Sequence, residues 1–148
     1  VSGTIVYLND APVMFKSSTQ KIIALSVTEA ELVAAVSCAQ DMLFVHKIVT
    51  SMELQVELPM VLELDNSGAK DLANNWSVGG RTRHVDVKYF FLRDLKENGT
   101  MKFVHIAGSE NESDIFTKNV EAPDLHRHVV KMCGSDTCFE SLKNGSSE

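Results

Sequence analysis

One long helical segment, predicted over residues 27–52, most constrains how this chain can fold, because it separates two groups of predicted strands. Ser26 and Glu29 form an S-x-x-E capping box that marks the start of the helix. Apolar side chains recur along one broad face of it, at Leu32, Ala35, Val36, Ala39, Leu43 and Ile48. A helix with such a face has to cover a sheet or another helix.

Strands and helices alternate around this segment. Two β-rich stretches, 4–8 and 12–16, flank Asn9-Asp10 and predict a β-hairpin. Further strands are predicted over 59–65 and 101–106, and further helices over 67–74, 87–98, a stretch opened by a second capping box at Ser109 and Glu112, and 124–132. This order predicts an α/β fold with an antiparallel hairpin and parallel strands made by helical crossovers.

Composition limits the kinds of protein that this chain can be. With 148 residues, 44% hydrophobic and 23% charged, it should form one domain, and collagen-like, coiled-coil and disordered classes are excluded. We expect the domain to span residues 1–132 and residues 133–148 to form a flexible tail. No apolar run approaches the 18–20 residues, roughly, that a membrane span needs, so we expect no membrane. Three cysteines without CxxC spacing indicate a reducing, intracellular compartment.

Three carboxylates occupy positions that ask for an explanation. Asp65 closes an apolar strand at its carboxyl end, where open α/β sheets bind ligands, although a turn or helix cap is an equal alternative. Glu31 leans toward the apolar side of the long helix and should have a metal or a cation as partner. Asp114 follows the last strand and, taken alone, is more simply a first-turn acid that favours the helix dipole.

Taken together, these three acids favour a metal site. They come from three elements and have little compensating charge nearby in the sequence. Carboxylate oxygens suit hard divalent cations such as Mg²⁺, and two such ions can hold a phosphodiester during its hydrolysis. Glu63 lies two residues before Asp65 and could add an oxygen, but a surface or salt-bridge role comes first.

A local basic cluster stands out on an acidic chain, which has 14 Lys and Arg against 20 Asp and Glu. With that balance, a nucleic acid would have to be held by a local patch. The cluster consists of Arg81, Arg83, His84 and Lys88, near the start of a predicted helix. A solvated surface is the plain interpretation, and contact with a phosphate backbone is the functional one that we favour.

Several sequence blocks resemble the ribonuclease H domain at the C-terminus of copia-type retrotransposon Pol polyproteins. The blocks follow the family's order over residues 2–132: SGTIV at 2–6, APV at 11–13, KSSTQK at 16–21, ALSVTEAEL at 24–32, LDN at 64–66, RTRHVD at 81–86 and NESDIFTK at 111–118. Each block is weak alone, and the combination is specific.

The resemblance implies an RNase H-like fold and hydrolysis of the RNA strand of RNA–DNA hybrids during reverse transcription, with two Mg²⁺ or Mn²⁺ ions. It places catalytic metal ligands at Glu31, Asp65 and Asp114, and backbone contacts around Arg81 to His84. It implies the hybrid and the upstream reverse transcriptase region as partners, and a cytoplasmic virus-like particle or the nucleus as location. The alternative is an inactive nucleic-acid-binding or assembly module derived from such a polyprotein.

One departure from the family pattern affects both activity and fold. The family's first catalytic Asp lies on a strand that precedes the hairpin, and we expect this chain to begin after that strand. Asp10, at the hairpin turn, is a poor substitute. Because the missing strand is the central one of the RNase H-like sheet, its absence should leave unpaired strand edges.

Overall fold

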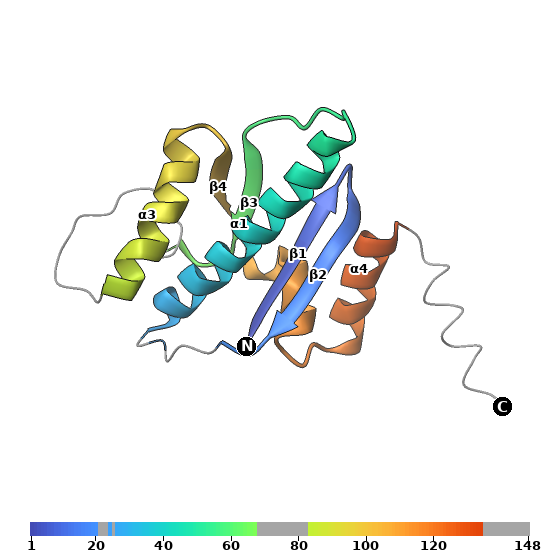
Figure 1. Ribbon diagram of the computed structural model, residues 1–148. Helices are drawn as coiled ribbons and strands as arrows, with labels where there is room; N and C mark the ends of the chain where they lie inside the picture. Colours follow the sequence, from blue (N-terminus) through green and yellow to red (C-terminus); the bar gives the residue numbers. More distant parts are fainter. Residues whose placement is uncertain (21–23, 25, 68–82, 135–148) are drawn as a thin grey trace.

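The computed structural model describes residues 1–20, 24, 26–67 and 83–134, and of residues 83–86 the backbone alone (Figure 1). The strands are β1 (Ser2–Leu8), β2 (Ala11–Ser18), β3 (Met60–Leu64) and β4 (Met101–His105). The helices are α1 (Val27–Ser51), α3 (Arg83–Glu97) and α4 (Ala122–Cys133), with two short 3₁₀ helices, η1 (Gly108–Glu110) and η2 (Glu112–Phe116). Most of the predicted helix over 67–74, and nearly all of the predicted tail, fall outside the described residues.

Strands β1 and β2 form the predicted antiparallel hairpin, with Ser2 opposite Ser18. At its turn Asn9 and Asp10 have φ of 49° and 62°. Two consecutive residues in the left-handed region are what a tight hairpin turn needs, and Asn and Asp tolerate that region better than most residues. The hairpin is therefore confirmed.

Helix α1 begins as predicted, because the Ser26 side chain accepts a hydrogen bond from the Glu29 amide at 3.1 Å. By length and composition α1 could cross a membrane, so the expectation that no segment is long enough is wrong. The middle of α1 carries few charged residues, which is why its composition suits a membrane span. Since Leu32, Ala35 and Ala39 on α1 are buried in the protein's main core, we interpret it as a core helix.

Strands β3 and β4 pair in parallel, with Leu62 opposite Phe103, as the crossover order predicts. The second predicted capping box is wrong. Ser109 lies inside η1, and the cap of η2 is Asn111, whose side chain accepts a hydrogen bond from the Ser113 amide at 3.1 Å. The helical stretch is accordingly two short 3₁₀ turns.

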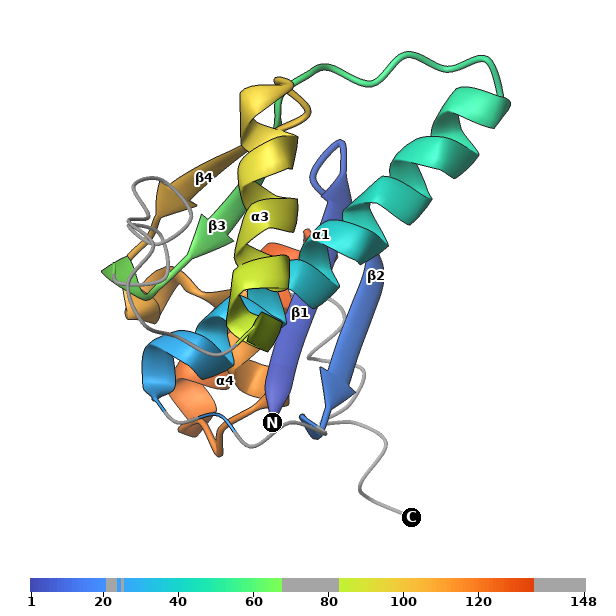
Figure 2. The ribbon, with the colours of Figure 1, turned by 60° about the vertical axis from the view of Figure 1, so that its left-hand side comes forward.

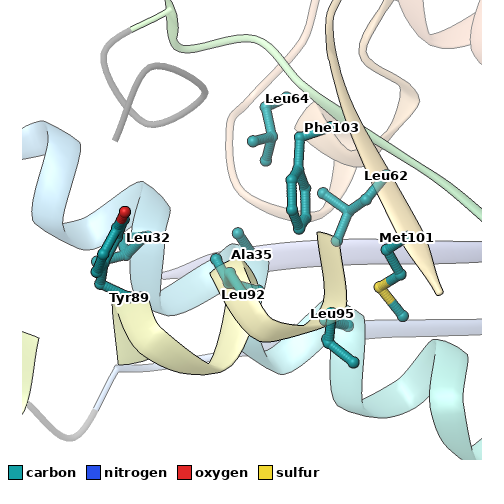
Figure 3. Packing of buried hydrophobic residues seen from close by; sticks show 10 residues of the cluster. Leu32, Ala35, Leu62, Leu64, Tyr89, Leu92, Leu95, Met101 and Phe103 are labelled. Atoms are coloured by element: carbon teal, nitrogen blue, oxygen red, sulfur yellow. The ribbon is translucent and has the colours of Figure 1, made fainter. Parts of the chain in front are cut away.

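The main core lies between α1, α3, β3 and β4 (Figure 3). Tyr89, Leu92 and Leu95 of α3 face Leu32 and Ala35 of α1, and the two parallel strands close the cluster with Leu62, Leu64, Met101 and Phe103. Each of these side chains is less than one-tenth exposed. Burial of such side chains contributes about 1.5–3 kcal/mol apiece, so this cluster is the main source of stability.

The hairpin lies between α1 and the η2 region. Ser2 faces α1, because Gln20 donates hydrogen bonds both to the Ser2 hydroxyl and to the Ala30 carbonyl, each at 2.7 Å. On the opposite face, the ring of Phe15 stacks on that of Phe116 at 5.8 Å between centroids. Alternating residues of the hairpin therefore contact two different layers.

The mixed α/β class is confirmed, but the strands that the structure describes form two separate two-stranded sheets. Figures 1 and 2 show α1 running across both pairs, with β1 and β3 as the inner strands. A single mixed sheet, as an RNase H-like fold implies, would need these two strands to be joined. The arrangement is compatible with an RNase H-like fold in which the strand between β1 and β3 is missing.

Candidate active site

The structure brings together the three acids that the sequence singled out. Glu31 lies near the start of α1, Asp65 follows β3 directly, and Asp114 lies in η2. Each of the three is partly buried. The negative charges of Asp65 and Asp114 both act on Glu31, so the three carboxylates share one region although they come from three elements.

The surroundings of Glu31 raise the pKa of its carboxyl. Burial is the largest cause that raises the pKa of the Glu31 carboxyl, followed by the charge of Asp65, while Lys118 opposes the rise and Asp114 adds to it. A raised pKa means that the ionised form is less favourable here than in water. An additional positive charge nearby would therefore favour the ionised form of Glu31.

Among the described residues, Lys118 is a cation that lies near these acids. Its Nζ donates to Asp114 Oδ2 at 2.8 Å, and this hydrogen bond is the largest cause that raises the pKa of the Lys118 ammonium. The charges of Asp65 and Glu31 raise it further. The charge of Lys118 also lowers the pKa of Glu31, but the contact of this lysine is with Asp114, and its side chain remains 61% exposed.

Asn111 connects two of the acids. Its Nδ2 donates to Asp65 Oδ2 at 3.1 Å, while its Oδ1 accepts from the Ser113 amide and from the Ser113 hydroxyl. One side chain therefore orients the Asp65 carboxylate and caps the short helix that carries Asp114. His105 adds a contact between its Nε2 and the Asp65 carbonyl at 3.1 Å.

The donor chemistry of this region fits a divalent cation. It offers three carboxylates, the oxygen ligands that Mg²⁺ prefers, and less positive charge than negative. In the part of the chain that the structure describes, no three His, Cys, Asp or Glu side chains converge closely enough to hold one ion. Asp114 instead accepts a hydrogen bond from Lys118. The three carboxylates therefore fit a divalent cation by the type of their oxygen atoms.

The predicted basic cluster is only partly visible. Arg81 lies outside the described residues, and Arg83 and His84 begin α3 with side chains that are not described. Lys88 is half-buried on the same helix.

Sequence reasoning missed the roles of Asn111, Glu112 and Lys118. Glu112 is buried and forms an ion pair with Lys131, whereas its position alone indicated a capping residue. Asn111 and Lys118 lie in the same block as Asp114, but nothing in that block indicates the contacts that they make. Glu63 is exposed and lines the space next to β1, in keeping with its interpretation as a surface residue.

Comparison with known proteins shows which proteins this chain is similar to. The chain is 30% identical over 119 residues to the retrovirus-related Pol polyprotein from transposon TNT 1-94 of Nicotiana tabacum. It is 30% identical over 131 residues to the Pol polyprotein from transposon RE1 of Arabidopsis thaliana, and 30% identical over 117 residues to that from RE2. Its relatives are retrotransposon Pol polyproteins.

The similarity covers 79–88% of this chain but only 8–9% of each polyprotein. The chain thus spans less than a tenth of the length of the curated relatives that it matches. No protein-family model matches the chain, and no solved structure matches it. The comparisons establish similarity to a segment of a Pol polyprotein.

Proposed function

We propose that this chain is the ribonuclease H part of a copia-type retrotransposon Pol polyprotein and hydrolyses the RNA strand of RNA–DNA hybrids during reverse transcription. The observation that supports this most is that Asp65, at the carboxyl end of β3, and Asp114, in η2, both act electrostatically on Glu31. Ligand sites of open α/β sheets lie at the carboxyl ends of strands. The similarity to Pol polyproteins supplies a biological setting for the same chemistry.

The proposed cofactor is Mg²⁺ or Mn²⁺, as two ions held by the three carboxylates. Such ions, when bound, neutralise the carboxylates and polarise both water and the scissile phosphate. The chain's own residues prepare the site: Asn111 fixes the direction of the Asp65 carboxylate. Lys118 fixes the direction of the Asp114 carboxylate through a hydrogen bond from its Nζ to Asp114 Oδ2.

The proposed substrate and partners follow from the same assignment. The RNA–DNA hybrid would contact the basic cluster around Arg83 and Lys88, and the upstream reverse transcriptase region would belong to the same polyprotein. The proposed location is the cytoplasmic virus-like particle or the nucleus, where reverse transcription products are made or used.

The test is cleavage of a labelled RNA–DNA hybrid in the presence of Mg²⁺, by a polyprotein segment that contains this chain and the reverse transcriptase region. Asp65→Asn should reduce cleavage by at least a hundredfold, because a metal-ligand oxygen is replaced by an amide. Asp94→Asn, an exposed acid on α3, is the matched control and should cleave at the parental rate. Melting temperatures of both variants should stay near that of the parent.

Two results would contradict the proposal. Undiminished cleavage by Asp65→Asn would remove Asp65 from the site. If the hybrid binds but is not cleaved under any divalent ion, the chain is instead a nucleic-acid-binding module. The bond between Lys118 and Asp114 is the feature that favours this second function, since it compensates a carboxylate without a metal.

A further inference from the structure

Glu112 is a buried carboxylate that the proposed reaction does not use. Its side chain is only 9% exposed, and it lies between Asn111 and Asp114 in the chain. A buried carboxylate is costly unless a cation or hydrogen-bond donors compensate it. The partner of Glu112 therefore decides how the segment around it is held.

The partner of Glu112 is Lys131, near the end of α4. Lys131 Nζ forms an ion pair with Glu112 Oε1, and the hydrogen bond to Glu112 is the largest cause that raises the pKa of the Lys131 ammonium. The side chain of Lys131 is 63% exposed, so the lysine reaches the buried carboxylate from the protein surface. This ion pair therefore joins η2 to α4.

A second contact joins α4 to η1. Arg127 Nη2 donates a hydrogen bond to the Ser109 carbonyl at 2.9 Å. Arg127 and Lys131 are four residues apart, which places them on the same face of α4. Figure 1 shows α4 beside the hairpin, and α4 contacts both β2 and η2. One face of α4 therefore holds both short helices, each by one cationic side chain.

The two short helices need such contacts to keep their position. η1 has three residues and η2 has five, and 3₁₀ helices of this length have little stability of their own. η2 contacts β1 as well as α4. Burial, followed by the charge of Glu112, raises the pKa of Tyr7 on β1 to about 12, so Glu112 also lies near this strand. The segment is therefore held by α4 and by the hairpin together.

The same segment carries two residues of the candidate site. Asn111 Nδ2 donates to Asp65 Oδ2 at 3.1 Å, and Asp114 belongs to η2. The ion pair of Glu112 and Lys131 lines the same cleft as Asp65 and Asn111. A shift of this segment would therefore move Asn111 away from Asp65 and displace Asp114.

We propose that α4 positions the candidate site, with Lys131 acting through Glu112 to fix the segment of residues 108–116. Both are positioning residues, which act through Asn111 and Asp114. The effect on cleavage rests on the proposed function, but the position of Asn111 can be measured without catalysis. An ion pair that served stability alone would leave Asn111 in place as long as the fold is intact.

The first test measures the position of Asn111 by NMR on the full chain. The assigned side-chain NH₂ signals of Asn111 report its hydrogen bond to Asp65. Lys131→Met should shift both signals toward those of a solvent-exposed amide, whereas Lys131→Arg, which keeps the cation, should leave them in place. Lys96→Met is the matched control, because Lys96 is also an exposed lysine in the last turn of a helix, and it should leave the signals unchanged.

The second test measures cleavage of the RNA–DNA hybrid by the polyprotein segment that contains this chain and the reverse transcriptase region, at a temperature where each variant is fully folded. Lys131→Met should lower the cleavage rate roughly 10- to 100-fold, because a displacement of about 1 Å from the productive geometry has a cost of this size. Lys131→Arg and Lys96→Met should cleave at the parental rate. If Lys131→Met does not fold, Glu112→Met replaces it in both tests, since that variant leaves no buried charge without a partner.

The outcomes separate this proposal from the proposed function. Asn111 signals that stay in place in folded Lys131→Met or Glu112→Met would overturn the positioning by α4, whatever the cleavage rate. A loss of cleavage that follows the melting temperature and leaves these signals unchanged would make the ion pair a stabilising contact only, and would overturn it too. A parent that does not cleave would refute the proposed function, and the shift of the Asn111 signals would then decide the positioning by itself.

Discussion

Gly3 allows β1 to lie directly against η2, and this contact can be tested with one methyl group. A Cβ at Gly3 would lie 2.5 Å from the Ser113 carbonyl oxygen and 2.8 Å from Thr117 Cγ2. Because the nearest atom is backbone, the clash cannot be relieved by a rotamer change alone. Gly3→Ala should push η2 away from the strand, and Asp114 with it.

The magnitude follows from two opposing effects. Inserting a methyl group into a packed contact costs about 1–3 kcal/mol. Ala lowers the conformational entropy of the unfolded chain, which stabilises the folded state by about 0.4–1 kcal/mol. The net loss in the free energy of unfolding should be about 1–2 kcal/mol, which corresponds to roughly 2–8 °C in melting temperature for a chain of this size.

Urea and thermal unfolding followed by circular dichroism measure this loss. Gly108→Ala is the matched control, because a Cβ there meets nothing within 4 Å, and it should keep only the entropic gain of about 0.4–1 kcal/mol. If Gly3→Ala proves as stable as Gly108→Ala, the close packing of η2 on β1 is not present in solution and the reasoning fails.

Three further predictions concern charge and burial. Because the pKa of Glu31 is raised, its ionisation destabilises the fold as the pH rises; Glu31→Gln should raise the melting temperature at pH 7, and the gain should vanish well below pH 4, where both side chains are neutral. An equal gain at both pH values would contradict this. Lys118→Met should lower stability by about 1 kcal/mol or less, and Mg²⁺ should raise its melting temperature more than that of the parent, as measured by thermal shift. Burial raises the pKa of Cys38 to about 12, so very little of its thiol is ionised at pH 8. In a variant whose other cysteines are serine, alkylation of Cys38 at pH 8 should therefore be more than about a thousandfold slower in the native than in the unfolded protein.

Much of the fold could be predicted because local signals agree with the tertiary structure. The Asn9-Asp10 turn and the Ser26 cap each depend on residues adjacent in sequence, and both are present. The Ser109 cap was wrong because Ser109 lies inside η1, and the next short helix begins two residues later, where Asn111 accepts from the Ser113 amide. When two capping residues lie this close together, their competition depends on how the segment packs, which the sequence does not state.

The position of the acids was predictable, whereas the residues that organise them were not. Asp65 could be placed because strands of an α/β sheet end at a common edge. Asn111 and Lys118 act through side-chain directions set by two short 3₁₀ turns, and those turns follow no hydrophobic period. The pattern therefore indicated which charges meet, but not which cation and amide hold them.

The main core draws its buried side chains from α1, α3, β3 and β4, while the hairpin packs against α1 and η2 instead. Proteins open in cooperative units that follow such divisions, and the unit with fewer buried apolar contacts opens first. Glu31 and Asp65 belong to the well-buried unit, whereas Asp114 and Lys118 lie beside the hairpin. The candidate site therefore exists only while the two units are docked, so a partial opening that leaves the core intact is enough to take the carboxylates apart.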